Sequence, residues 1–376
     1  MIESSFLYQL LKKRIDFYTG VPDSLLKSFC AYIFDNVAKD RHIIAANEGN
    51  AIALAAGHYL ATGNIALVYM QNSGLGNAIN PLISLTDRKV YHIPLLLMIG
   101  WRGEPGQPDA PQHITDGKIT LDLLKTAGIY FEILPQAAVE ARESLKRIFE
   151  VIRKNGCPCA LIIRKDTFQP YIQKKRVKAP LADLSREQAI KIIIDHLNPK
   201  DAIVSTAGHI SRELFEYNQK LKGKQGRNFL NIGAMGHSSQ IALSIALEKP
   251  RRQIYCLDGD GAVIMHMGSM ATIGAKGTPN FKHVILNNGS HDSVGGQPSV
   301  AFSIDFVRIA RACGYYFAAR ANSAKQLKKR IMDFAKARGP ALLEVIVKKG
   351  SRKDLGRPTL SPLEIKASFI KFLRKR

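Results

Sequence analysis

Three polar side chains that follow two apolar segments in the second half of the chain are of types that bind a divalent metal. The segment YCLDGDGAV places Asp260 between Gly259 and Gly261, where a predicted strand ends, and the next apolar stretch ends in Asn287-Asn288. Because open α/β sheets bind ligands at the carboxyl ends of their strands, this carboxylate and an amide oxygen are predicted to lie side by side. Such a pair suits Mg²⁺ that completes its octahedron with diphosphate oxygens and water.

The glycines on either side of Asp260 strengthen the prediction of a phosphate site. They allow the backbone to approach a phosphate closely, and the predicted helix that follows offers free N–H groups and the positive end of its dipole. A single Gly-Asp-Gly is also an ordinary turn. The specific signal is therefore its combination with two asparagines at the end of the next strand.

The elements that must position these residues occur in two similar halves. Each half shows a helix of small apolar residues, a buried strand, a Gly-rich turn, a second helix and a second strand. These segments lie at 49–63, 65–70, 71–77, 78–85 and 91–100 in the first half, and at 236–250, 253–259, 259–263, 265–277 and 281–289 in the second. Strands that are apolar throughout and alternate with helices predict an α/β protein with two doubly wound parallel sheets. The spacing from Gly49 to Gly74 equals that from Gly236 to Gly261, which favours an old duplication over chance agreement of a common pattern.

The boundary between the halves is predicted from composition. A polar segment at 166–183 holds two prolines and a basic run, as is typical of a linker. Ser185 followed by Gln188 predicts the capped start of the next helix. The chain is thus divided into a first domain at 1–170, a linker at 171–184 and a second domain at 185–376.

The composition narrows the class of protein. With 46% hydrophobic and 23% charged residues the chain is globular rather than disordered. We expect no signal peptide and no membrane span, and therefore a cytoplasmic location. Cys157 and Cys159 flank one proline, which is not the spacing of a zinc knuckle, so the five cysteines are predicted to be inert thiols.

The formal net charge of +23 raises the question of a nucleic-acid partner. The lysines and arginines are scattered, with short runs at 174–176, 328–330 and 374–376, and no aromatic residues interleave with them as a base-stacking surface requires. We therefore expect solvated surface and no nucleic acid or membrane partner. A basic protein also attracts a multiply charged anionic substrate.

The GDG segment followed by NN resembles the motif that binds thiamine diphosphate and Mg²⁺. By this resemblance Asp260 and Asn288 bind the metal through their side chains and Ser290 through its carbonyl, with Asn287 as the alternative to Asn288. The resemblance also implies that Gly259 and Gly261 contact the cofactor.

The same resemblance assigns further cofactor contacts. Glu48 matches the glutamate that is hydrogen-bonded to the aminopyrimidine of the cofactor and activates it; its alternative role is a carboxylate favoured by a helix N-terminus. Met235 resembles the bulky apolar residue that keeps the cofactor bent, although a core methionine would look alike. Asn72 and Ser73, which follow Gln71 at a strand end, are predicted to face cofactor or substrate, although both are common turn residues.

Over nearly its whole length the chain resembles the thiamine-diphosphate-dependent phosphonopyruvate and sulfopyruvate decarboxylase family. The short linker leaves no room for the central third domain that many thiamine enzymes carry. His209, in STAGH, departs from the lysine-like residue expected there. The matching segments are TGVPDSLL (19–26), ANEGNAIALAAGHYLATG (46–63), 71–82, WRGEPGQPDAPQH (101–113), SRELFE (211–216), NNGSHDSVGGQPS (287–299) and 348–362.

The resemblance implies decarboxylation of 3-phosphonopyruvate to phosphonoacetaldehyde and CO₂, a step of phosphonate biosynthesis. Asp23 and His113 are the candidates for the acid that protonates the product. Asp23 is also placed to cap a helix, and His113 could be an ordinary loop histidine. Arg102 or Arg352 is predicted to bind the phosphonate.

Other functions stay open at this point. Sulfopyruvate or another 2-oxo acid is the nearest alternative substrate, and a basic nucleic-acid-binding protein is the alternative from another class. Glu48 and Asp260 lie in different halves, and in this family the corresponding domains meet between subunits. The resemblance therefore implies a homodimer or larger oligomer with the active site at the subunit interface.

Overall fold

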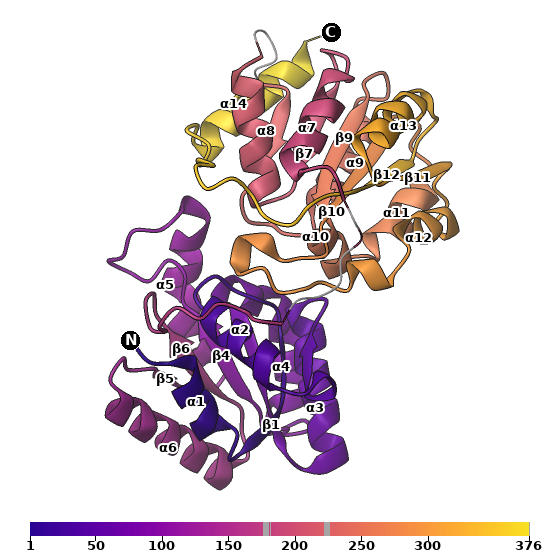
Figure 1. The fold of residues 1–376 in the computed structure, drawn as a ribbon. Coiled ribbons are helices and arrows are strands. Elements are labelled where there is room, and N and C mark those ends of the chain that lie inside the picture. The colour runs from indigo at the N-terminus through magenta and orange to yellow at the C-terminus, as the bar shows by residue number, and fades with distance from the viewer. Residues whose placement is uncertain (176–179, 181, 222–225, 376) are drawn as a thin grey trace. The chain divides into compact units, whose positions relative to one another are not determined.

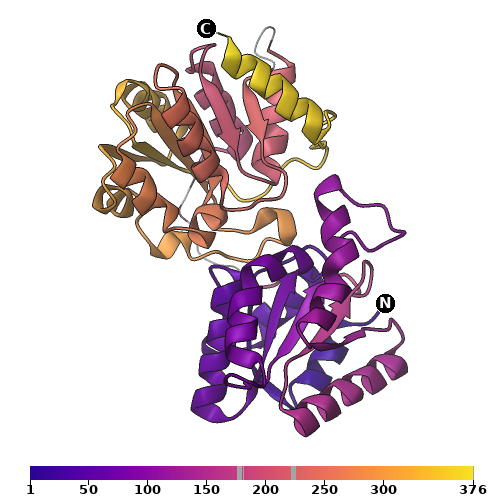
Figure 2. The ribbon, with the colours of Figure 1, turned by 180° about the vertical axis from the view of Figure 1, so that it is seen from behind.

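Two compact units make up the chain, Met1–Val177 and Lys178–Arg376. The structure, a computed structural model, describes residues 1–175, 180, 182–221 and 226–375. Each unit is a six-stranded, wholly parallel sheet with helices on both faces, as Figures 1 and 2 show from opposite sides. The predicted class, two doubly wound α/β domains, is confirmed. In the described part of the chain every helix is too short or too polar to cross a bilayer.

In the first unit the strands lie in the order β2-β1-β3-β4-β6-β5. One face of the sheet is covered by α1, α2 and α6, whose apolar side chains form one core cluster, and the other by α3, α4 and α5, which form a second. The strands are β1 (Ile15–Gly20), β2 (His42–Ile44), β3 (Ile65–Gln71), β4 (Leu96–Gly100), β5 (Tyr130–Ile133) and β6 (Cys159–Ile163). The helices are α1 (Ser4–Leu11), α2 (Lys27–Asn36), α3 (Glu48–Thr62), α4 (Leu75–Thr86), α5 (Pro111–Thr126) and α6 (Ala138–Asn155), with short 3₁₀ turns η1 (Lys39–Arg41) and η2 (Asn72–Gly74).

In the second unit the strands lie in the order β11-β12-β10-β9-β7-β8. Helices α7, α8 and α13 pack on one face, and α9, α11 and α12 on the other. The strands are β7 (Ala202–Ser205), β8 (Asn228–Leu230), β9 (Ile254–Gly259), β10 (Phe281–Asn287), β11 (Phe317–Ala321) and β12 (Ala341–Ile346). The helices are α7 (Arg186–Asp195), α8 (His209–Gln219), α9 (Ser238–Glu248), α10 (Asp260–Met265), α11 (Ser269–Lys276), α12 (Phe306–Ala312), α13 (Ala324–Lys336) and α14 (Pro362–Arg374), with 3₁₀ turns η3 (Asp292–Val294) and η4 (Ala301–Ser303).

The two sheets share one topology. When the strands of each unit are numbered from its own first strand, both sheets have the order 2-1-3-4-6-5. Strands buried on both faces explain why the sequence shows continuous apolar runs instead of alternation. In this order the chain direction across the sheet reverses between the first and third strands, where open α/β sheets bind ligands. The shared topology agrees with the duplication that the sequence predicts.

Two predicted segments differ from the structure at their ends. The turn predicted at 259–263 is already helical, because α10 begins at Asp260. This helix ends at Met265, so the helix predicted at 265–277 is divided from it and begins only at Ser269, as α11. Gly268 lies at this division, where a residue without a Cβ favours a change of direction. The strand predicted at 91–100 is ordered as β4 only from Leu96.

The segment predicted as a linker is tied to the first unit over its first part. The backbone N–H groups of Lys174 and Lys175 donate to the carboxylate of Asp35 at 2.7 and 2.8 Å. Residues 176–179 and 181 lie outside the described residues. The predicted capping box at the start of α7 is present, with Ser185 and Gln188 each bonding the backbone of the other.

Candidate functional site

Asp260 is a buried carboxylate at the carboxyl end of β9, and its side chain is 2% exposed. Ser299 donates a hydrogen bond to Oδ2, and the backbone N–H of Asn288 lies 3.4 Å from Oδ1. Burial raises the pKa of Asp260 to about 6, and the nearby charge of Asp292 adds to the rise, although the bond from Ser299 works against it. A buried carboxylate that faces another carboxylate is stabilised by a bound cation, as the predicted metal site requires.

The structure separates the roles of the two asparagines that end β10. The Asn287 amide donates to Glu344 of β12 at 2.8 Å, and its oxygen accepts the N–H of Gly289 at 3.0 Å, so this side chain joins two strands. Asn288 instead lies beside Asp260, and its Oδ1 accepts the N–H of Ser290 at 3.0 Å. An amide oxygen has two lone pairs, so this oxygen keeps one for a metal. The geometry favours Asn288 over Asn287 as the ligand.

A buried ionic network holds Asn288 in place. Its amide donates to Oδ2 of Asp292 at 2.7 Å, and the same oxygen accepts from Arg186 at 3.1 Å and from the backbone N–H of Gly350 at 2.8 Å. Arg186 also makes a two-bond ion pair with Glu213, at 2.9 and 3.0 Å, and both side chains are at most 4% exposed. Asp292 therefore fixes which way the amide of Asn288 points.

Met235 and His291 lie against the glycine after Asp260. A Cβ placed on Gly261 would lie 3.0 Å from the ring of His291 and 3.6 Å from the methyl group of Met235. The loop that carries Met235 is held by Asn231, whose oxygen accepts the N–H of Ala234 at 3.0 Å. The structure thus brings Met235 to the Gly-Asp-Gly turn, although the sequence separates them widely.

Glu48 is the first residue of α3 and is only 5% exposed. Asn77 of α4 donates to its Oε2 at 2.9 Å. A Cβ on Gly74 would lie 2.6 Å from the Glu48 side chain, so only glycine fits there. Burial raises the pKa of Glu48, and the bond from Asn77 offsets this only in part. Glu48 is thus a carboxyl at a helix start that is also buried, and its contact with a cofactor stays a prediction.

Asp23 lies after β1, buried at the point where the strand order reverses. Gln71, at the end of β3, donates to Asp23 Oδ2 at 2.7 Å, and the exposed hydroxyl of Ser73 donates to Gln71 at 2.8 Å. Asp23 Oδ1 accepts the N–H of Leu25 at 2.9 Å, whereas α2 begins only at Lys27 and has Leu26 at its cap position. Asp23 therefore stabilises the turn before the helix and is joined to the surface through two polar side chains.

Asn72 has a structural task in the first unit. Its amide donates to the Arg102 carbonyl and to Thr120, both at 2.9 Å, which uses both amide protons. Its oxygen accepts the Arg102 N–H at 3.1 Å. The end of β3 is thereby tied to the loop after β4 and to α5. Direct contact of Asn72 with a cofactor stays a prediction.

His113 lies in the first turn of α5, near Asp23 and Arg102. Burial lowers the pKa of His113, the charge of Arg102 lowers it further, and Asp23 acts in the opposite direction. Its Nδ1 is buried and has no hydrogen-bond partner within the described residues. Gly103 packs against the backbone of this turn, since a Cβ there would overlap the His113 carbonyl. The structure therefore brings together the two residues predicted as proton donors.

The two arginines predicted to bind the phosphonate are already engaged. Arg102 makes a two-bond ion pair with Asp109 and a hydrogen bond to Ser24 at 2.9 Å. Burial of Asp109 works in the opposite direction, yet the bond from Arg102 holds the pKa of that carboxyl well below its usual range. Arg352 is within ion-pair distance of three carboxylates, those of Glu187, Glu216 and Asp354. Their roles in substrate binding stay predictions that this geometry disfavours.

A different pair of arginines, Arg212 and Arg357 in the second unit, is close enough for their charges to interact. Gly356 is fixed to α8 because its N–H donates to Glu216 at 2.8 Å, and the next residue is Arg357. Burial lowers the pKa of Arg212, also on α8, and the nearby charge of Arg357 lowers it further. Neither arginine makes an ion pair with any described residue. Arg212 in turn contributes to the lowered pKa of His209, for which burial is the main cause.

Sequence reasoning missed the residues that orient the site. Asp292 follows the Asn-Asn pair by only a few positions, and its carboxylate could have been noticed there. Asn77 lies one helical turn after Gly74, and Gly74 packs against the side chain of Glu48. Asn77 therefore comes close to Glu48 as well. Arg186 gave no signal, because it looks like an ordinary residue in the first turn of a helix.

Comparisons with known proteins cover both units. Residues 3–122 match the profile "Thiamine pyrophosphate enzyme, N-terminal TPP binding domain", and residues 207–345 match "Thiamine pyrophosphate enzyme, C-terminal TPP binding domain". The chain is 32% identical to phosphonopyruvate decarboxylases of Streptomyces viridochromogenes and Streptomyces hygroscopicus, over 94% of this chain and 90% and 89% of theirs. It is 26% identical to a sulfopyruvate decarboxylase of Methanosarcina acetivorans, over 94% of this chain and 93% of the relative.

Proposed function

The chain belongs to the thiamine-diphosphate-dependent decarboxylase family that includes phosphonopyruvate and sulfopyruvate decarboxylases, and we propose that it converts 3-phosphonopyruvate to phosphonoacetaldehyde and CO₂. The observation that carries this proposal is similarity over both units at once. The matched regions include Glu48 in the first unit and both Asp260 and Asn288 in the second. A product of this kind is consistent with a place in phosphonate biosynthesis.

Mg²⁺ and thiamine diphosphate are proposed to bind at the ends of β9 and β10. Asp260, Asn288 and the Ser290 carbonyl supply the oxygens that Mg²⁺ takes in proteins, and phosphate oxygens complete the set. The buried carboxylate of Asp260, whose ionised form is also disfavoured by the charge of Asp292, fits a bound cation. When bound, the cofactor supplies the electron sink that accepts the electron pair left by departing CO₂.

Glu48 is proposed to hold a proton against the pyrimidine ring of the cofactor. Burial raises its pKa, which favours the protonated carboxyl that this role needs, and Asn77 fixes its orientation. The matched variant for testing this role is Glu48→Gln, whose amide keeps the shape of the side chain but cannot exchange the proton. Because Glu48 and Asp260 belong to different units, we propose a homodimer or larger oligomer in which the complete site lies between subunits.

Asp23 and His113 are proposed to protonate the product and to order its carbonyl group. Asp23 is buried and His113 is half-buried, and the hydrogen bonds of Gln71 and Ser73 join Asp23 to the surface. A neutral imidazole, which the lowered pKa of His113 favours, can both accept and donate a proton. A positioned acid of this kind accelerates a proton transfer by about 10²–10⁴.

Arg212 and Arg357 are proposed to bind the phosphonate of the substrate in place of Arg102 and Arg352. Two neighbouring guanidinium groups repel each other, and an anion bound by both offsets that repulsion. They therefore favour an anion with more than one charge. Gly350 and Gly356, near the two ends of the loop that leads to Arg357, are hydrogen-bonded to Asp292 and Glu216. The anion site is thereby joined to the network that holds Asn288.

The substrate is tested by measuring CO₂ release from phosphonopyruvate, sulfopyruvate and pyruvate under the same conditions. We expect the highest kcat/KM with phosphonopyruvate. Sulfopyruvate is the second candidate, because a relative of that name aligns over 94% of the chain. Equal kcat/KM for pyruvate would refute recognition of an anionic headgroup. If the protein instead only bound nucleic acid, it would show salt-sensitive binding of DNA or RNA and no turnover of any of these substrates.

A further inference from the structure

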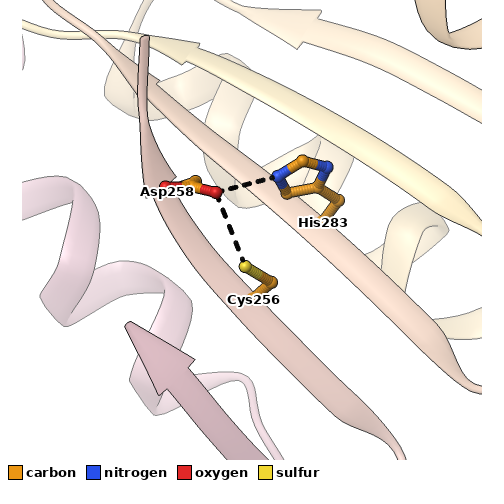
Figure 3. Close-up of side chains that lie close together, drawn as sticks. All are labelled: Cys256, Asp258 and His283. Carbon is orange, nitrogen blue, oxygen red and sulfur yellow. Dashed lines mark hydrogen bonds and ion pairs between the residues drawn. The ribbon is translucent and has the colours of Figure 1, made fainter. Parts of the chain in front are cut away.

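Three side chains of metal-binding types meet inside the sheet of the second unit. Cys256 and Asp258 are two residues apart on β9 and therefore point to the same face of the sheet. His283 lies opposite Cys256 in the register of β10. Figure 3 shows the three side chains turned toward one another, and each is at most 1% exposed. None of them is among the residues proposed above for the cofactor or the substrate.

The contacts within this cluster leave polar atoms without partners. Oδ2 of Asp258 lies 3.8 Å from Cys256 Sγ and 3.6 Å from His283 Nε2. The second distance exceeds the usual hydrogen-bond range of about 2.7–3.2 Å. Asp258 Oδ1 and His283 Nε2 have no hydrogen-bond partner in the part of the chain that the structure describes. Buried atoms of this kind are normally satisfied, so these two point to an absent partner between them.

We propose that Cys256, Asp258 and His283 bind one structural zinc ion. A thiolate, an imidazole nitrogen and a carboxylate oxygen are the three donor types that zinc takes from proteins. One Zn²⁺ with a thiolate, a carboxylate and a neutral imidazole has no net charge, which suits a fully buried place. Mg²⁺ does not fit, because it prefers oxygen ligands and the thiolate is a soft donor.

The distances within the cluster are close to those of a tetrahedral zinc site. Zinc bonds of about 2.0 Å to nitrogen or oxygen and 2.3 Å to sulfur place tetrahedral ligand atoms about 3.3–3.6 Å apart. The carboxylate oxygen lies 3.6 Å from the nitrogen and 3.8 Å from the sulfur, and the ligand atoms of all three residues lie within 4.8 Å of one another. The first two distances are thus within a few tenths of an ångström of the tetrahedral values, and the sulfur and the nitrogen lie within 4.8 Å of each other.

Tyr315 orients the histidine for this role. Its hydroxyl lies 3.3 Å from His283 Nδ1. In the tautomer that carries its proton on Nδ1, this nitrogen donates to Tyr315 and Nε2 presents its lone pair to the cluster. Metal-binding histidines commonly use their second nitrogen in this way. The ion would link β9 to β10 just before Asp260 and Asn287, at the strand ends that carry the cofactor site.

The test is the metal content of the purified full-length protein after passage over a chelating resin, measured by inductively coupled plasma mass spectrometry. We expect about one zinc ion per chain, and about a tenth of that or less in Cys256→Ala. The matched control is Cys30→Ala, which removes an equally buried thiol from the first unit and keeps the zinc. Asp260→Ala also keeps the zinc, which separates this site from the proposed magnesium site.

Cobalt provides a second measurement if Cys256→Ala fails to fold. Wild-type protein produced with Co²⁺ in place of zinc is expected to show a thiolate-to-cobalt charge-transfer absorption, which the cofactor site cannot produce because it has no sulfur ligand. The proposal is overturned if wild-type protein holds less than about a tenth of an ion per chain, both as isolated and after refolding with zinc. It is also overturned if folded Cys256→Ala retains its zinc or if the cobalt protein lacks this absorption. These outcomes do not depend on the proposed reaction.

Discussion

Replacing Asp292 with asparagine tests whether metal affinity depends on a side chain that only positions a ligand. In the wild type, one carboxylate oxygen of Asp292 accepts bonds from Arg186, the Asn288 amide and the Gly350 N–H. An asparagine keeps one oxygen acceptor but loses the charge, and its NH₂ group cannot accept. We expect a cost near that of one charge-assisted hydrogen bond, about 1.5–3 kcal/mol.

That cost corresponds to a loss of Mg²⁺ affinity of about 10–100-fold, the range found when a group that orients a metal ligand is removed. Calorimetric titration of Mg²⁺ into protein with saturating thiamine diphosphate measures it, and circular dichroism confirms that the variant is folded. Asp354→Asn is the matched control, since this carboxylate lies in the loop that also carries Gly350 and is 81% exposed. It should leave Mg²⁺ affinity unchanged.

The reasoning about Asp292 is refuted if folded Asp292→Asn binds Mg²⁺ as tightly as the wild type. A reduced unfolding temperature with unchanged affinity would have the same meaning, because the network would then stabilise the unit without positioning Asn288. A different result is expected if the cofactor does not bind at the proposed site at all. In that case Asp260→Ala would also bind Mg²⁺ and thiamine diphosphate normally.

Three further changes test separate parts of the account. Glu48→Gln should keep cofactor affinity within a few-fold but lower kcat by about 10²-fold or more, since the amide cannot exchange a proton; wild-type turnover would contradict the role of Glu48. Arg212→Met should raise KM for phosphonopyruvate by about tenfold or more and leave pyruvate nearly unaffected, since one charge-assisted contact is lost; an equal effect on both substrates would exclude a headgroup contact. Burial raises the pKa of Asp201 to about 6 from 3.8, so the folded state favours its protonated form, and stability is lost as pH rises between about 4 and 6. Urea unfolding should therefore show that the wild type loses about 2 kcal/mol more than Asp201→Asn over this interval, and parallel pH profiles would show that the carboxyl titrates normally.

The sequence was sufficient for the fold class and for the meeting of Asp260 with Asn288. Continuous apolar strands that alternate with helices admit few arrangements other than parallel sheets covered on both faces. In such sheets all carboxyl ends lie at one edge, so residues that follow neighbouring strands meet whatever the details of packing. The capping box at Ser185 was predictable for a similar reason, because it depends only on residues three positions apart.

The partners of individual side chains were decided by tertiary structure. Asn287 and Asn288 are adjacent and identical in type, and only the neighbouring Glu344 of β12 gives the first one a structural bond. Arg102 was predicted to bind the anionic substrate, but in the fold its guanidinium donates to Asp109.

What the sequence determined were properties that repeat along the chain or act over a few residues: strand burial, helix capping and the alternation of strands with helices. The Asp292 network and the Cys256–Asp258–His283 cluster each join residues from separate strands or helices. Such contacts depend on strand register and side-chain direction. A shift of one residue in the pairing of β9 with β10 would turn His283 to the opposite face of the sheet. Only the packed structure fixes that register, because many distant apolar contacts stabilise it together.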